Sequence, residues 1–236
     1  MSVVEVNYDF WEQRFEILKQ KMKGLHIALN EALPENVSRL KDLKELTKCL
    51  RIYTNGEFEF FKDGFTRLDE KKLNSTNRYP PEHSFRSVIH QGYEDTKLYE
   101  HIFSQRSSTD QTVRKALEVV DKLAWDALQP AMAFEESLIP KNTTILSYFD
   151  KIASVRIIPY APVALIGVPF TALNEPIDLL AIPHEIGHYV FQRATKPAKD
   201  IDRNDYQRSL RNIIYRTISN ERDPENRNKA FYPGYL

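Results

Sequence analysis

Apolar residues recur at steps of three and four through the first segment of the chain. This spacing places them on one face of a helix, and the positions are Tyr8, Trp11, Phe15, Leu18, Met22, Leu25 and Leu29. Such a pattern is typical of an amphipathic helix that buries one face in a core. The pattern is not sustained as heptads beyond this segment, so a core helix is favoured over a dimerising coiled coil.

A second helix and then a hairpin are predicted next. The helix begins near Asn36 or Ser38, since either side chain could cap its N-terminus. Residues 52–65 are rich in Phe and Tyr around the step Asn55-Gly56. An Asn-Gly step between apolar stretches is typical of a tight β-turn. We therefore expect a short hairpin at 52–65.

Two more helices are predicted before the chain changes character. Ser84 could cap a helix that runs towards Phe103. Ser108 or Asp110 opens another, which has a stronger apolar face. We expect that helix to stop at Pro130, because proline lacks an N–H and crowds the preceding turn.

The pattern changes at Pro140. Short β-branched, apolar runs at 155–158 and 163–166 predict two strands separated by a proline-containing turn. A helix is expected at about 177–193, and a last helix at about 205–220. The strands are therefore expected to lie between helical segments.

These elements predict an α+β fold that is mostly helical. We expect a helical region over 1–139 and a second region over 140–236, in which a small β-sheet packs on the 177–193 helix. The chain has 236 residues, of which 42% are hydrophobic and 11% aromatic. Such a chain can bury a core, which excludes a disordered protein.

Charge and cysteine content indicate which partners and which cellular compartment to expect. The 33 basic and 33 acidic residues balance, so nothing draws the chain globally to nucleic acid or to an anionic membrane. The lone Cys49 allows no internal disulfide, and the N-terminal residues lack a basic stretch followed by an apolar one. We therefore expect a cytoplasmic protein with no nucleic-acid or membrane partner. The oligomeric state stays open.

One short segment carries recognisable chemistry: His184-Glu185-Ile186-Gly187-His188. Two histidines four residues apart on a helix lie on one face, one turn apart. Their ring nitrogens can then meet a single zinc ion at about 2.0–2.1 Å. Glu185 stands beside the first histidine, where it can accept a proton from zinc-bound water. The apolar flanks suit a buried helix that turns its metal face to a cleft.

Pro183 immediately precedes this segment. Inside a helix it would remove one backbone hydrogen bond and introduce a kink, whereas in the first turn it is well tolerated. Both alternatives leave His184 and His188 on one face.

This stretch resembles the active-site helix of the zincin metallopeptidases. The resemblance implies that His184 and His188 bind Zn²⁺ and that Glu185 is the general base for hydrolysis of a peptide or protein substrate. It also implies a mixed sheet above the helix whose edge strand holds the substrate in extended form, a role that suits the strands at 155–166. The resemblance covers only the segment and its flanks.

The third zinc ligand separates the zincin subclasses. A metzincin would carry a glycine and a third histidine where this chain has Phe191 and Ala194, so that subclass is disfavoured. Gluzincins take a glutamate from a later helix, and this resemblance points to Glu221. An equal alternative is a ligand beyond Leu236, in which case the catalytic region is incomplete at its C-terminus.

Weaker candidates complete the sequence-based hypotheses. Asp202 and Asp205 are less favoured as third ligands, and the remaining histidines are interpreted as ordinary surface or core residues: His26, His83, His90 and His101. The alternatives to a peptidase are a zinc hydrolase of a non-peptide amide and a non-catalytic helical interaction module with a degenerate metal site. Glu185 favours an enzyme, because a purely structural zinc site has four protein ligands and no need of a base.

Overall fold

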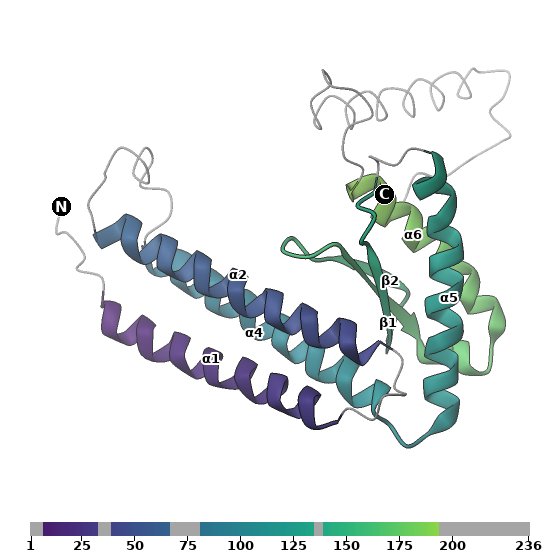
Figure 1. Ribbon diagram of the computed structural model, residues 1–236, viewed down its shortest axis with the longest axis horizontal. Helices are drawn as coiled ribbons and strands as arrows, with labels where there is room; N and C mark the ends of the chain where they lie inside the picture. Colours follow the sequence, from purple (N-terminus) through teal and green to yellow (C-terminus); the bar gives the residue numbers. More distant parts are fainter. Residues whose placement is uncertain (1–6, 33–38, 67–80, 135–138, 194–236) are drawn as a thin grey trace, which may run out of the picture.

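The computed structural model describes residues 7–32, 39–66, 81–134 and 139–193. Within these ranges the protein is mostly helical with one small sheet, which confirms the predicted α+β class (Figure 1). The helices are α1 (Tyr8–Glu31), α2 (Leu40–Thr66), α4 (Pro81–Arg106), α5 (Gln111–Phe134) and α6 (Ala181–Arg193). The strands are β1 (Thr144–Asp150), β2 (Ser154–Ile157) and β3 (Val163–Pro169), and two 3₁₀ helices follow them, η1 (Phe170–Leu173) and η2 (Pro176–Leu180).

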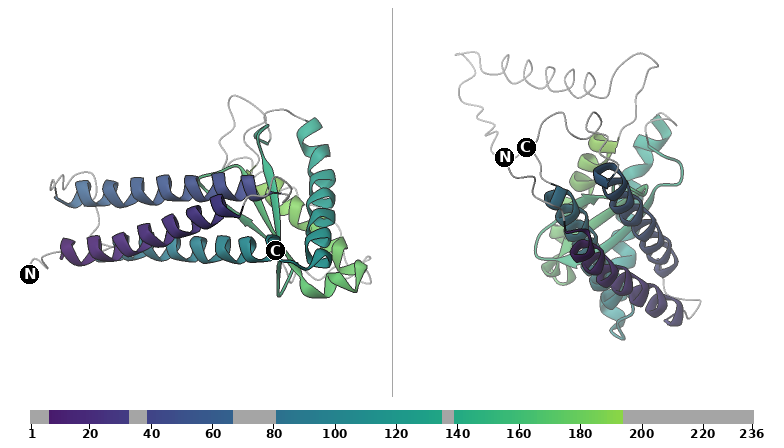
Figure 2. Two further views of the ribbon diagram at one scale, coloured as in Figure 1. Left: turned by 60° about the horizontal axis from the view of Figure 1, so that its bottom comes forward. Right: turned by 90° about the vertical axis from the view of Figure 1, so that its left-hand side faces the viewer.

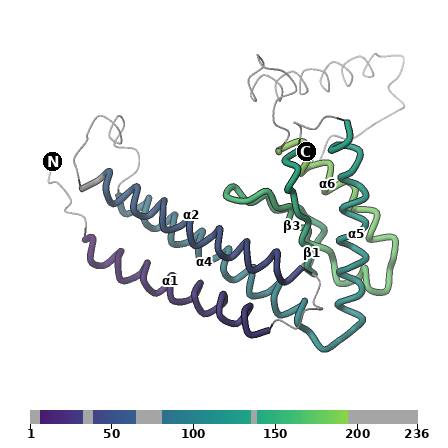
Figure 3. Tube along the Cα trace, in the orientation of Figure 1, coloured from purple at the N-terminus to yellow at the C-terminus, as the bar shows by residue number. Residues whose placement is uncertain are grey.

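The helices α1, α2 and α4 form a helical arm that projects from the sheet (Figures 1, 2 and 3). The predicted apolar face of α1 is buried from Trp11 to Leu29, and Asn7 caps the helix by accepting the Phe10 N–H at 3.0 Å. At Gly92, α4 lies close to both α1 and α2. A Cβ there would lie 2.7 Å from Leu18 Cδ2 and 3.0 Å from Thr54 Cγ2, so only glycine fits this crossing without a shift.

The predicted hairpin at 52–65 is wrong, because α2 continues through Asn55-Gly56 without a break. Thr54 and Phe58 are buried and extend the period of Leu50 by one and two helical turns. Asn55 and Gly56 lie on the exposed face. There a glycine costs about 1 kcal/mol of helix propensity, which is less than the gain from burying a phenylalanine.

Helix boundaries differ in part from the predicted ones. Asp110 caps α5, since its Oδ1 accepts the Thr112 N–H at 2.8 Å. The expected stop at Pro130 is wrong, because α5 runs on to Phe134. Pro130 is exposed, so water can reach the carbonyl whose helical partner is missing. The expected caps of α2 and the predicted helix at 205–220 lie outside the described residues.

The sheet has the strand order β1-β3-β2. β1 pairs with β3 in parallel, and β2 pairs with β3 antiparallel, with Val155 opposite Ile166. The strands predicted at 155–158 and 163–166 are confirmed as β2 and β3, whereas β1 was not predicted. β1 and β2 are therefore the two edges of a mixed sheet.

Alternate residues of the strands pack against opposite layers. Phe149 and Ile166 join a hydrophobic cluster with α5 and α6, and Tyr148 and Leu165 join a second cluster with the helical arm. The sheet is thus covered on both faces. The division at 139/140 stays a prediction, and α5, on its N-terminal side, packs with the sheet and α6.

The outer edge of β1 is closed by side chains from α4 and α5. Gln105 Oε1 accepts the Phe149 N–H at 2.7 Å, and Gln105 Nε2 donates to the Phe149 carbonyl at 2.9 Å. The Ser147 N–H donates to Asp121 at 2.9 Å, and the Ser147 carbonyl accepts from Arg106 at 2.7 Å. These side chains replace a neighbouring strand at this edge. Among the described residues, the backbone of β2 is hydrogen-bonded only to β3.

Candidate metal centre

The helix α6 begins close to the predicted segment. Residues 176–180 form the 3₁₀ helix η2, and the α-helix starts at Ala181, so Pro183 is the third residue of its first turn. The N–H groups of a first turn have no helical acceptor, and proline therefore costs little there. Of the two alternatives for Pro183, the structure has the first-turn position.

One face of α6 is fixed by burial. Ile182, Ile186 and Tyr189 are each no more than 1% exposed and pack with α5 and the sheet. This buried face turns the other side of the helix outward. His184 is exposed, and Glu185 and His188 are half-buried. The segment thus presents its histidines to solvent from a helix whose back is firmly packed.

The two histidines converge. His184 Nε2 and His188 Nε2 are 3.0 Å apart, and the ring planes are at 86° with centroids 4.6 Å apart. Two nitrogens that bind one zinc ion tetrahedrally at about 2.0–2.1 Å are roughly 3.3 Å apart. The observed separation is close to that value. The pair therefore fits a single ion of this size with a small change in the ring positions.

Glu185 belongs to the same group. One ligand atom from each of His184, Glu185 and His188 can be chosen so that all three lie within 4.8 Å of one another. Two imidazoles and a carboxylate are donors that suit zinc and other divalent transition metals. The group can accordingly hold a cation and keep a carboxylate next to it.

The C-terminal end of α6 is tied to the sheet. Arg193, its last residue, donates from Nη2 to the carbonyls of Ile158 and Ala161, the latter at 2.9 Å. Both carbonyls lie in the connection between β2 and β3. A cation is also favourable at a helix C-terminus, where the peptide dipoles leave partial negative charge. The end of the edge strand β2 is thereby held against the helix that carries the histidines.

The other side of this connection is tied to the helical arm. Asp95 of α4 is 1% exposed and accepts from Arg156 of β2 and from the Tyr160 hydroxyl, the latter at 2.9 Å. The Tyr160 and Tyr99 hydroxyl oxygens are 2.5 Å apart. Burial raises the pKa of Asp95 against the opposing effect of the Arg156 charge, and burial likewise raises the pKa of Tyr99 and of Tyr160.

Sequence reasoning missed this buried network. Asp95 and Tyr160 are 65 residues apart in the chain, and no local pattern marks them as partners. His101, interpreted from the sequence as an ordinary histidine, has its Nε2 3.1 Å from the Phe149 carbonyl at the edge of β1. The one available signal for this network was the position of Asp95 in the helical period of Val88, Tyr99 and Ile102.

The predicted third ligands lie outside the described residues. These are Glu221, the weaker candidates Asp202 and Asp205, and any residue past Leu236. Among the residues that the structure describes, His184, Glu185 and His188 are the group whose ligand atoms lie close enough together that they could hold a metal ion. The origin of a third protein ligand stays a prediction.

No protein-family model, curated protein or solved structure matches this chain. In the described ranges, no helix is both long and apolar enough to cross a membrane. The function is therefore inferred from the geometry of α6 and of the edge strand β2 beside it.

Proposed function

We propose that the chain is a zinc-dependent metallopeptidase. The observation that carries this proposal is the 3.0 Å approach of His184 Nε2 to His188 Nε2, with the Glu185 carboxylate in the same group. A structural zinc site would have four protein ligands and no need of an adjacent base. A pair of histidines that solvent can reach, beside a carboxylate, favours a catalytic site, which keeps a position open for water and substrate.

His184, His188 and Glu185 have different roles in the proposed hydrolysis. His184 and His188 would hold the zinc ion, which would lower the pKa of a coordinated water to about 7 and polarise the scissile carbonyl. Glu185 takes a proton from the attacking water and gives it to the nitrogen of the leaving amine. The water oxygen ends in the new carboxylate, and the C–N bond is the bond that breaks.

The neighbouring sheet supports a peptide as the substrate. β2 is an antiparallel edge strand, and Arg193 ties its end to α6. An extended chain that pairs with such an edge gains backbone hydrogen bonds that do not depend on its sequence. The opposite edge, β1, is closed by Gln105, Arg106 and Asp121. The edge formed by β2, close to α6, is therefore the one that suits the addition of a substrate strand.

Two further points belong to this proposal. A third ligand is required, and Glu221 remains the predicted one, with a residue past Leu236 as the alternative. We place the protein in the cytoplasm, since a chain with a single cysteine forms no internal disulfide and suits a reducing compartment.

The test combines metal analysis with one conservative substitution. Protein purified without chelator should contain about one equivalent of zinc by elemental analysis and should cleave members of a mixed peptide library. Glu185→Gln should keep the zinc and lose cleavage by a factor of about a hundred or more. The matched control is Glu175→Gln, which removes the same charge from an exposed site that precedes η2.

The outcomes separate the hypotheses. Absence of zinc together with unchanged cleavage in Glu185→Gln would reject the metallopeptidase. Retained zinc without cleavage of any library peptide would favour a hydrolase of a non-peptide amide or a degenerate metal site.

A further inference from the structure

A groove lies between α1 and α4 in the helical arm. Its volume is about 410 Å³, and its walls include Trp11, Arg14 and Ile17 from α1 and Arg86, His90 and Tyr93 from α4. These residues belong to the N-terminal halves of both helices, at the end of the arm away from α6 (Figure 1). The groove is within the size range of sites that bind small molecules or short peptide segments.

Part of the lining of the groove is apolar. Leu18 and Trp11 are buried lining residues, while Ile17 is 65% exposed and Tyr93 is 37% exposed. Exposed apolar side chains that gather around a hollow mark interaction surfaces more often than single scattered ones do. The groove can therefore take up an apolar side chain of a ligand.

The two arginines of the groove form no ion pair with any described residue. Arg14 lies over the Phe10 ring, 4.7 Å from its centroid, and among the described residues neither Arg86 nor His90 has a hydrogen-bond or ion-pair partner. The two lysines next to Tyr93 differ in this respect. Lys21 pairs with Glu100 at 2.7 Å, and Lys97 pairs with Glu94 at 3.2 Å. Arg14 and Arg86 are thus guanidinium groups of the groove that have no ion-pair partner in the described part of the chain.

We infer that this groove binds an acidic peptide segment that also carries an apolar side chain. Arginine binds carboxylates through two parallel N–H donors, which gives both strength and orientation. Tryptophan, tyrosine and arginine dominate the binding energy of protein interfaces, and the groove contains all three. Carboxylates of the segment bind Arg14 and Arg86, and its apolar side chain packs between Ile17 and Tyr93.

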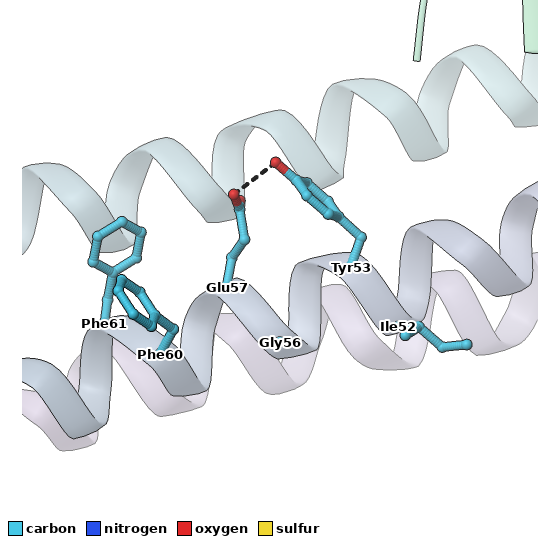
Figure 4. A pocket seen from close by; sticks show the side chains of 6 residues that line it. All are labelled: Ile52, Tyr53, Gly56, Glu57, Phe60 and Phe61. Carbon is cyan, nitrogen blue, oxygen red and sulfur yellow. Dashed lines mark hydrogen bonds between the residues drawn. The ribbon is translucent and has the colours of Figure 1, made fainter. Parts of the chain in front are cut away.

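A second hollow differs from the groove in the charge of its lining residues. It lies on α2 over Ile52, Tyr53, Phe60 and Phe61 and has a volume of about 440 Å³. Its charged side chain, Glu57, already accepts a hydrogen bond of 2.6 Å from the Tyr53 hydroxyl (Figure 4). Among the described residues, the lining of that hollow holds no arginine or lysine, whereas the groove between α1 and α4 has Arg14 and Arg86.

The inference does not rest on the metal centre. The groove would recruit an acidic segment whether the chain cleaves peptides or not. If the chain is a peptidase, the bound segment would be a part of the protein substrate that lies at a distance from the scissile bond.

The test uses the full chain and two labelled peptides. The probe is Glu-Glu-Leu-Phe-Glu-Glu-Leu-Phe-Glu-Glu, and its neutral counterpart has Gln in place of every Glu. Fluorescence anisotropy should show binding of the acidic peptide and a fall in affinity with added salt. The double variant Arg14→Glu/Arg86→Glu should bind it about tenfold more weakly or worse. Ile17→Ser, at an exposed position, should weaken binding several-fold.

A matched double variant controls for net charge. Lys41→Glu/Arg51→Glu makes the same charge change at two exposed positions of α2 and should keep the affinity. Circular dichroism of each variant verifies folding. Equal affinity for the neutral peptide, full affinity in the groove variant, or an equal loss in the control variant would each overturn the inference.

Discussion

The carboxylate of Asp121 on α5 accepts two hydrogen bonds of 2.9 Å from the guanidinium of Arg106 on α4. Both residues are 3% exposed. The same carboxylate also accepts from the Ser147 N–H at 2.9 Å and from the Ser147 hydroxyl at 2.7 Å. One buried ion pair thus joins two helices to the edge strand β1.

Removing the charge of Asp121 should be strongly destabilising. Asp121→Asn removes the carboxylate charge that accepts both 2.9 Å hydrogen bonds from the Arg106 guanidinium, and breaking a buried pair in this way costs about 3 kcal/mol or more of unfolding free energy. Urea unfolding measures the change. The control is Asp126→Asn on the same helix, whose exposed pair with Lys122 contributes at most about 1 kcal/mol. Similar losses in the two variants would contradict a special role for the buried pair.

Two helical glycines should respond in opposite directions to the same substitution. Gly24 on α1 is exposed, and a Cβ there meets no atom within 4 Å, so Gly24→Ala should raise the unfolding free energy by about 0.5–1 kcal/mol. Gly92→Ala should lower it, because the new methyl group would lie 2.7 Å from Leu18 Cδ2. Thermal unfolding of the two variants provides the comparison. Stabilisation by both would mean that the arm is not closely packed at Gly92.

Tyr53 makes the free energy of unfolding depend on pH in the alkaline range. Burial, and then the hydrogen bond to Glu57, raise the pKa of Tyr53 from 10.0 to about 12. Between these values the folded state keeps a proton that the unfolded state has lost. Stability should therefore fall as pH rises from about 10 to about 12. Tyr53→Phe should reduce the slope of unfolding free energy against pH in this window. An unchanged slope would show that the Tyr53 hydroxyl ionises alike in both states.

Metal binding should raise the thermal stability of the protein, which can be measured without an assay of cleavage. A ligand that binds only the folded state adds about 2.7 kcal/mol when present at a hundred times its dissociation constant. Zinc should therefore raise the thermal midpoint of the wild type, and a chelator should reverse the effect. His188→Ala should abolish the response, whereas His90→Ala, which removes an exposed imidazole in the helical arm, should preserve it. A zinc response that survives in His188→Ala would place the ion elsewhere.

Periodicity predicted the elements whose apolar positions are continuous. The buried face of α1 follows directly from the spacing of its apolar residues, and the strands β2 and β3 follow from short β-branched, apolar runs. The segment around Asn55-Gly56 misled the prediction because turn propensity acts locally, while the decisive term, burial of Thr54 and Phe58 against the arm, is tertiary. A longer window would have extended the period of Leu50 through Phe58.

β1 could not be recognised for a different reason. Its central residue is polar, and Ser147 becomes a buried strand residue only because Arg106 and Asp121 satisfy its hydrogen bonds from other elements. Such partners are not visible in a local window. At the candidate metal centre the situation is reversed, because the spacing of His184 and His188 within one helix is a local property. A third ligand would come from another part of the chain, and no local pattern decides it.

The shared sheet has a consequence for folding. Within each of β1 and β3, neighbouring residues support opposite clusters, as Tyr148 and Phe149 do. Loss of the helical arm would uncover one face of the strands on whose other face α6 rests. We expect arm, sheet and α6 to melt in a single cooperative transition. A destabilising substitution far from His184 would then reduce the fraction of molecules with an intact histidine pair, without altering the pair itself.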